Sequence, residues 1–228
     1  MKTKMRFATI FTLCLSMRAA ELEKARDAQD RAALDRLAQS ALAAAQKSPG
    51  DPAAQYKAAL AQSYLAEVAI EQRDKNQAHS AAEAGIDFAK KAVALKDNSA
   101  EYHRVYGTLC GQAISANIMQ GLKYGHCAKD EVDRAVQLDP KSSINYVARG
   151  IGYYYLPQPL GGGNDLAIKD FEKALELDAK SDEAHLWLGL ALRKANRNAD
   201  ARKEFQKALE LNPSRVWIRQ QLDKTPAG

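Results

Sequence analysis

Beyond its first 20 residues, the sequence contains no apolar run close to the ~20 residues that a membrane-spanning helix requires. β-Branched residues are also scarce, whereas alanine, leucine, lysine, glutamate and arginine are abundant. This composition disfavours a sheet and favours helix. We therefore expect an all-α fold, and no membrane span in the mature chain.

A large excess of positive charge is absent once the N-terminus is set apart. The formal net charge is +5, from 33 basic and 28 acidic residues, but Lys2, Lys4, Arg6 and Arg18 all lie in the first 18 positions. The remaining 29 basic and 28 acidic side chains nearly balance. Because nucleic-acid binding depends on a concentrated basic surface, we expect no nucleic-acid partner.

The N-terminus itself is a candidate signal peptide. Met1–Arg6 is basic, and the apolar run Phe7–Met17 falls within the ~7–15 residues typical of a secretory leader. Small residues suited to cleavage follow, although Arg18 interrupts them. We expect residues 1–18 to be removed and the mature chain to be periplasmic or secreted. An uncleaved chain in the cytoplasm is the alternative.

The residue patterns of common catalytic and metal sites are missing. The histidines are scattered, and none lies in an HExxH or CxxC context. No acyl-transfer elbow is present, and no pair of carboxylates differs from the charged helix faces. We expect no catalytic residues, no metal, no cofactor and no enzymatic activity.

Cysteine is rare, with three in the chain. Cys14 lies in the candidate leader, which leaves Cys110 and Cys127. Exported proteins often join such pairs in a disulfide, but the two Cα atoms must come within ~7 Å. The sequence does not fix the turn between these cysteines, so their state stays open.

What the sequence does contain is a repeat. Four segments align, and each combines the end of one helix with a polar stop: 92–103, 135–146, 174–185 and 208–213. Their leading alanines are 43, 39 and 34 residues apart. This pattern is typical of helix pairs that stack into a solenoid, because one pair cannot bury its apolar face alone.

The last repeat resembles a tetratricopeptide repeat (TPR). The residues that match the spacing of that family are His185, Leu188, Gly189, Leu192, Ala201, Phe205, Ala208 and Pro213. His185 replaces the usual tryptophan, and His103 has the same place in an earlier repeat, so we expect both to pack within the fold. The resemblance weakens towards the N-terminus. It implies an all-α, TPR-type helix-turn-helix solenoid of an exported bacterial protein.

The hairpins of this solenoid are predicted to shorten along the chain. The distance between their two small residues is 24 for Ala61–Gly85, 21 for Gly107–Ala128, 17 for Gly150–Ala167 and 12 for Gly189–Ala201. Only the last is the length usual for a TPR, so the earlier hairpins should have longer helices or extended turns.

The expected units follow from these spacings. An N-terminal capping helix occupies 19–50, unbroken over 20–47, and precedes a divergent hairpin at 51–98. An extended TPR at 99–141, a TPR with a Pro/Gly insertion at 142–180 and a standard TPR at 181–214 come next. A C-terminal capping helix and tail complete the chain at 215–228.

Gly161–Gly163 precede a predicted helix, as glycines do in phosphate-binding loops. A P-loop requires Lys-Ser or Lys-Thr after the last glycine, but Asn164 and Asp165 follow here. A dinucleotide fingerprint requires a preceding strand, and a repeat helix precedes here. We interpret the glycines as a hairpin turn, with Asn164 or Asp165 capping the second helix.

The TPR resemblance implies that the first helices line a groove that binds a protein or peptide. The corresponding positions are Ile144, Val147, Ile151, Tyr154, Tyr155, Leu186, Leu190, Arg193, Lys194 and Arg197. An apolar stripe with a basic edge would suit a segment of acidic character. The predicted function is a non-enzymatic scaffold, and a small-molecule or lipid carrier associated with an uptake system is the alternative. Partner identity and oligomeric state are not determined by the sequence.

Overall fold

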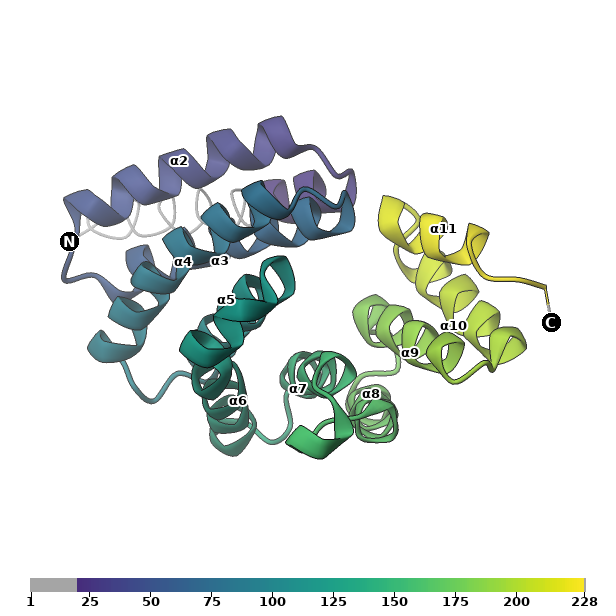
Figure 1. Cartoon of the computed structure of the whole chain (residues 1–228). Coiled ribbons are helices and arrows are strands. Elements are labelled where there is room, and N and C mark those ends of the chain that lie inside the picture. Colours follow the sequence, from purple (N-terminus) through teal and green to yellow (C-terminus); the bar gives the residue numbers. More distant parts are fainter. Residues whose placement is uncertain (1–19, 228) are drawn as a thin grey trace, which may run out of the picture.

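The computed structural model describes residues 20–227, and every regular element in that range is a helix (Figure 1). A helical segment at residues 20–27 is followed by α2 (Arg31–Lys47), α3 (Pro52–Glu71), α4 (Lys75–Leu95), α5 (Ala100–Ala116), α6 (Gly121–Leu138), α7 (Ser143–Tyr155), α8 (Asn164–Leu177), α9 (Asp182–Lys194), α10 (Asn198–Leu211) and α11 (Val216–Asp223). Short 3-10 helices, Ile118–Gln120 and Gln158–Leu160, precede α6 and α8. The candidate leader, residues 1–18, lies outside the described residues.

The helices pack in pairs, and the pairs stack in chain order. α3 packs on α4, α5 on α6, α7 on α8 and α9 on α10, while α4 also contacts α5 and α8 contacts α9. Figure 1 shows the stack curving so that its two ends approach one another. The predicted all-α, TPR-type solenoid with capping helices at its ends is therefore confirmed.

Small residues let the two helices of a pair approach closely. In α7, a Cβ atom at Gly150 would lie 2.5 Å from the ring of Phe171 on α8. In α9, a Cβ at Gly189 would lie 2.7 Å from the ring of Phe205 on α10. Both rings are fully buried, so each glycine makes room for a buried phenylalanine ring of its hairpin.

Polar side chains at repeated positions tie each pair to the turn before it. His103 and His185 direct one ring nitrogen at the backbone carbonyls of Asp97 and Ala179, each six residues earlier. Tyr146 donates its hydroxyl to the equivalent carbonyl of Pro140. The predicted packing role of the two histidines is confirmed.

The extra length of the early hairpins has different origins. α3 and α4 contain 20 and 21 residues, against 13 and 14 in α9 and α10, so the first hairpin is longer because its helices are longer. In the third hairpin, α7 and α8 have 13 and 14 residues and the added length forms the turn between them. Both predicted forms of extension therefore occur: longer helices in the first hairpin and an extended turn in the third.

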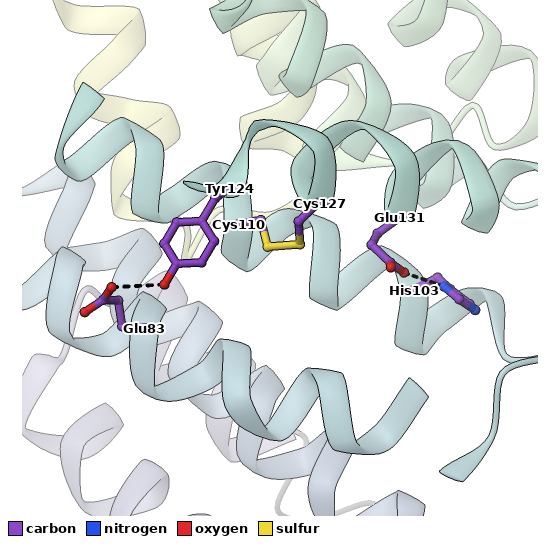
Figure 2. Close-up of a disulfide and its surroundings, with 6 residues drawn as sticks. All are labelled: Glu83, His103, Cys110, Tyr124, Cys127 and Glu131. Carbon is purple, nitrogen blue, oxygen red and sulfur yellow. Dashed lines mark hydrogen bonds and ion pairs between the residues drawn. A yellow bond between two sulfur atoms is a disulfide. The ribbon is translucent and has the colours of Figure 1, made fainter. Parts of the chain in front are cut away.

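A disulfide joins the two helices of the second hairpin (Figure 2). Cys110 on α5 is bonded to Cys127 on α6, and their Cα atoms are 6.0 Å apart. Two side-chain contacts accompany it in Figure 2: Tyr124 donates its hydroxyl to Glu83 of α4 at 3.0 Å, and His103 pairs with Glu131 at 2.5 Å. Covalent and polar links thus hold α6 against both α5 and α4.

Two local predictions are wrong. The capping helix expected over 20–47 is interrupted after residue 27, where Gln29 adopts a left-handed conformation with φ of 53° and Asp30 caps α2 by accepting from the Ala33 N–H. Neither Asn164 nor Asp165 caps α8; its N-cap is Gly163, with φ of 120° and no side-chain cap. Asn164 instead donates its amide to the carbonyl of Ala191 on α9, so it links neighbouring repeats.

Candidate functional site

The two ends of the solenoid are joined by a buried ionic cluster. Its members, which we call the clasp, come from the segment at residues 20–27, from α3, from α9 and from the start of α11: Arg26, Asp27, Glu67, Glu71, Glu183 and Arg215. The clasp contacts include residues as far as 189 positions apart in the chain. They convert an open stack of helices into a ring.

Arg215 is the centre of the clasp. Its side chain is fully buried, and it donates to Glu67 at 2.6 Å and to both carboxylate oxygens of Glu71. Arg26 lies beside it, 3.0 Å from Glu183 and 2.7 Å from Asp27. A buried guanidinium is tolerated only when paired in this way, because its desolvation costs several kcal/mol.

Hydrogen bonds from side-chain amides extend the same closure. Asn212, just after α10, donates to Asp27 at 2.9 Å and to Asp182 at 2.8 Å. Gln220 of α11 donates to Gln29 at 3.1 Å. The turn at residues 28–30, which the sequence did not predict, is therefore part of the joint.

The clasp has more carboxylates than guanidinium groups. Burial raises the pKa of Glu67 to about 7, and the opposing charges of Arg215 and Arg26 do not fully reverse this effect. Burial likewise raises the pKa of Glu71. Above the pKa of Glu67 the four carboxylates exceed the two guanidinium groups in charge, whereas below it bound protons offset part of this excess.

The ring surrounds a cavity of about 1950 Å³. Its wall comes from the segment at residues 20–27 and from α2, α3, α5, α6, α7 and α9, with Trp217 added by α11. Helices α4, α8 and α10 contribute nothing to the wall in the described part of the chain. The first helices of the hairpins therefore face inward, as a TPR solenoid requires.

Aromatic and aliphatic side chains dominate one side of this wall. Tyr155 and Trp187 pack edge to face with ring centres 6.1 Å apart, and Trp187 meets Trp217 in the same manner at 5.5 Å. Tyr155 is 53% exposed. Ile118 and Leu160, from the turns of the second and third hairpins, are 83% and 68% exposed at the edge of the cavity. Such exposed apolar surface is typical of a binding site.

The charged residues of the wall are mainly acidic. The carboxylates are Glu21, Glu23, Asp27, Asp51, Glu67, Glu71, Glu101, Asp133, Asp182 and Glu183, and the basic residues are Arg26, Lys57, Arg104, Lys129 and Arg149. Several of these cations are already paired within the chain, Arg149 with Asp170 and Lys129 with Asp133 among them. Several carboxylates are paired as well, among them Asp133 with Lys129 and the clasp acids with Arg26 and Arg215. Because carboxylates outnumber Lys and Arg by ten to five in the wall, the cavity presents apolar surface with an excess of acidic groups.

The structure places the predicted groove residues in two groups. Ile144, Val147, Ile151 and Tyr155, all on α7, line the cavity. Tyr154 lies outside it, with its ring 5.8 Å from Trp187 and 4.2 Å from the Lys194 ammonium group. Whether the four lining residues bind a partner stays a prediction.

The predicted groove residues of the last repeat do not line the cavity. Leu186 and Leu190 are buried in the core. Arg193 donates to the Gln221 side chain at 2.8 Å, Lys194 donates to the Tyr154 carbonyl at 2.6 Å, and Arg197 pairs with Asp200. These basic side chains have intramolecular partners, so the basic edge expected for an acidic partner is not part of this wall.

Sequence reasoning missed the residues that enclose the site. Arg215 precedes a capping helix that was predicted, but nothing in its local pattern indicates pairing with Glu67 and Glu71, 148 and 144 residues away. Trp217 was expected only as part of the closing helix, and Trp187 was not singled out. The one signal in the sequence that could have indicated this pairing is the position of Arg215, a basic residue immediately before the apolar start of α11.

The site has no arrangement suited to catalysis by a metal. Among residues 20–227, no group of three or more His, Cys, Asp or Glu side chains is positioned to hold a metal ion. In the same range, none of the helices combines the length and apolarity that crossing a membrane demands. The wall offers apolar contact, aromatic faces and negative charge.

A ring of TPR-type helix pairs around a cavity defines a helical-repeat protein. Comparison with known families agrees: residues 161–216 match a tetratricopeptide repeat. The chain belongs to the family described as Regulator of microtubule dynamics protein 1-3, whose profile matches residues 16–158. Proteins of these two families are generally non-catalytic scaffolds. The N-terminal part of the chain, where the resemblance to TPRs is weaker, is thus the part that matches the Regulator of microtubule dynamics profile.

Individual relatives are similar over part of their length. Regulator of microtubule dynamics protein 3 of Mus musculus is 28% identical over 144 residues, which are 56% of this chain and 31% of that protein. The Rattus norvegicus protein of the same name is 27% identical over 173 residues, 68% of this chain and 36% of the relative. The chain spans about a third of the length of these curated relatives.

A solved structure shares the fold. The crystal structure of a thermophilic TPR protein from Thermus thermophilus superposes with a TM-score of 0.62, covering 84% of this chain and 90% of that one at 21% identity. At this level of identity the likeness concerns the fold alone.

Proposed function

We propose that this chain is a non-enzymatic scaffold that holds a segment of another polypeptide in its central cavity. The observation behind this proposal is the size and lining of the cavity, about 1950 Å³ with exposed tyrosine, isoleucine and leucine side chains. Small-molecule sites usually measure ~300–1,000 Å³, so the space suits a polypeptide segment better. The name of the curated relatives refers to microtubule dynamics, but we propose only the binding role for this shorter chain.

A carrier of lipids or small molecules is the second candidate. The clasp favours it, because joining the two ends of the solenoid adds protein contacts around the cavity and would remove part of an apolar ligand's surface from water. A lipid would contact the same aromatic and aliphatic wall. Only its mass and chemistry would distinguish it from a peptide.

Photo-crosslinking separates the two candidates. A photoreactive amino acid would replace Tyr155 in the cavity and, as a control, Glu172, which is exposed on α8 and lies outside the cavity wall. The scaffold predicts a polypeptide adduct in the native host at position 155 only. A lipid or metabolite adduct at 155 would favour the carrier, and equal adducts at both positions would contradict a cavity site.

We further propose that the protein is exported, to the periplasm of a bacterium or outside the cell. Two observations support this: the basic and apolar leader over residues 1–18, and the Cys110–Cys127 disulfide, since disulfides persist mainly in oxidising compartments. The mass of the chain purified from its host provides the test. Loss of the leader, with the two cysteines oxidised, is the expected result; an intact, fully reduced chain would contradict export.

A further inference from the structure

We propose that the segment held in the cavity is a basic amphipathic polypeptide, with apolar side chains on the aromatic wall and lysines or arginines facing the acidic residues. This inference rests on the proposed function and narrows the partner to one class. The sequence alone suggested a partner of acidic character, whereas this inference gives the partner a positive charge. Charge complementarity with the wall, argued below, is what selects this occupant.

The apolar and acidic parts of the wall adjoin each other. Tyr155 packs edge to face with Trp187, with ring centres 6.1 Å apart, and Trp187 lies one helical turn after Glu183 on α9. Asp182 and Glu183 begin α9, the helix that also presents Trp187. One bound segment could therefore meet aromatic rings and carboxylates within a short length of chain. Aromatic faces near carboxylates suit lysine and arginine through both cation–π and ionic attraction.

The acidic residues retain unused capacity for a cation. Within the clasp, the four carboxylates Asp27, Glu67, Glu71 and Glu183 outnumber the two guanidinium groups of Arg26 and Arg215, and the other donors to them are the neutral amides of Asn212 and Gln29. Asp182 accepts a neutral amide, that of Asn212, and burial raises its pKa. Glu21 and Glu23 on the first helical segment are exposed at the wall. A positive side chain placed here would gain attraction without breaking an existing pair.

Peptide titration of the full chain tests the inference. Both tryptophans of the chain, Trp187 and Trp217, line the cavity, so their fluorescence reports occupancy directly. Three designed amphipathic peptides of about 16 residues, roughly 24 Å long as helices, would share one leucine pattern. Their polar positions would be lysine, glutamine or glutamate.

The expected order of affinity is lysine, then glutamine, then glutamate, with at least a tenfold difference between the first and last. Raising the salt concentration should weaken the lysine peptide most. The double variant Glu21→Gln/Glu23→Gln should bind it about three- to tenfold more weakly. The matched control Glu172→Gln/Glu210→Gln removes two exposed carboxylates outside the wall and should bind as the unmodified protein does.

Each contrary result has a distinct meaning. Equal binding of the three peptides, or preference for the glutamate peptide, would overturn the basic partner and leave the scaffold function intact. Binding of none, while a fatty acid shifts the tryptophan signal, would overturn both proposals. Equal weakening by the test and control variants would also overturn the inference, because the effect would then come from net charge alone.

Discussion

At the scale of single residues, Arg215 has the largest predicted effect. Replacing it by alanine leaves Glu67 and Glu71 buried around an empty space without their cation. Breaking a buried pair from one side costs about 3–5 kcal/mol, and we expect the free energy of unfolding to fall by that amount at pH 8. Urea denaturation provides the measurement. Arg219→Ala, at an exposed position of the same helix, is the control and should change stability by less than about 0.5 kcal/mol.

Glu67 is expected to make stability depend on pH. Its pKa is about 7 in the fold against 4.5 in its ordinary state, with Arg215, Arg26, Glu183 and Glu71 as its charged neighbours. A raised pKa means that the folded chain binds the proton more tightly, so the stabilisation is complete below pH 4.5 and is lost as the pH rises through 7.

Comparison with Glu67→Gln isolates this contribution. The stability of the unmodified protein relative to the variant should decrease by on the order of 1–2 kcal/mol between pH 4.5 and pH 8. A constant difference across this range would show that folding leaves the pKa of Glu67 unchanged. An increasing difference would show that its pKa is lowered in the fold.

Gly189 tests the close approach of α9 and α10. Alanine there would place Cβ 2.7 Å from the buried ring of Phe205, and overpacking of this kind costs about 1–3 kcal/mol. Gly111→Ala on α5, where nothing lies within 4 Å of the new Cβ, should instead be neutral or stabilise by up to ~1 kcal/mol. Thermal unfolding of both variants gives the comparison. If the two substitutions change the unfolding midpoint by similar amounts, helix propensity and not packing determines the effect of alanine at these positions.

At the scale of helices, the second hairpin depends on its disulfide. Cys110 and Cys127 are 17 positions apart, and closing a loop of that size stabilises by about 3 kcal/mol in the chain-entropy account. A reducing agent should therefore lower the unfolding midpoint of the unmodified protein. The variant Cys110→Ala/Cys127→Ala should unfold at the lower midpoint with or without the agent. If the reducing agent leaves the unfolding midpoint of the unmodified protein unchanged, the disulfide does not have this stabilising role.

The sequence predicts these helices well where the cause is local. Periodic apolar residues and the small residues Gly150 and Gly189 specify where two helices meet, and the polar stops mark the turns. The break after residue 27 was missed because it has no glycine or proline; Gln29 takes up a left-handed conformation instead. The cap of α8 was misassigned because Asn164 is drawn into a bond with the neighbouring repeat. Both errors arise from contacts beyond the hairpin.

At the scale of the whole molecule, the site depends on contacts that no local pattern contains. The repeat predicts a solenoid with α7 on its inner side, and Ile144, Val147, Ile151 and Tyr155 do lie there. The curvature that brings α11 to α3 accumulates from every hairpin, including those of irregular length. The sequence also does not show which side of α9 points into the cavity. Arg193 and Leu190, which were expected on the inner side, therefore could not be reassigned from the sequence alone. The joining of the two ends by Arg215 and its partners was therefore beyond prediction.

The clasp also changes how the molecule should come apart. A linear array of repeats loses its terminal units first, because each end has a neighbour on one side only. Here the two terminal segments are each other's neighbours through Arg215, Asn212 and Gln220, so neither should fray alone. Amide hydrogen exchange in α11 and in residues 20–27 should consequently proceed at matched rates, and Arg215→Ala should accelerate both together. The array behaves as a cycle without a first or a last repeat.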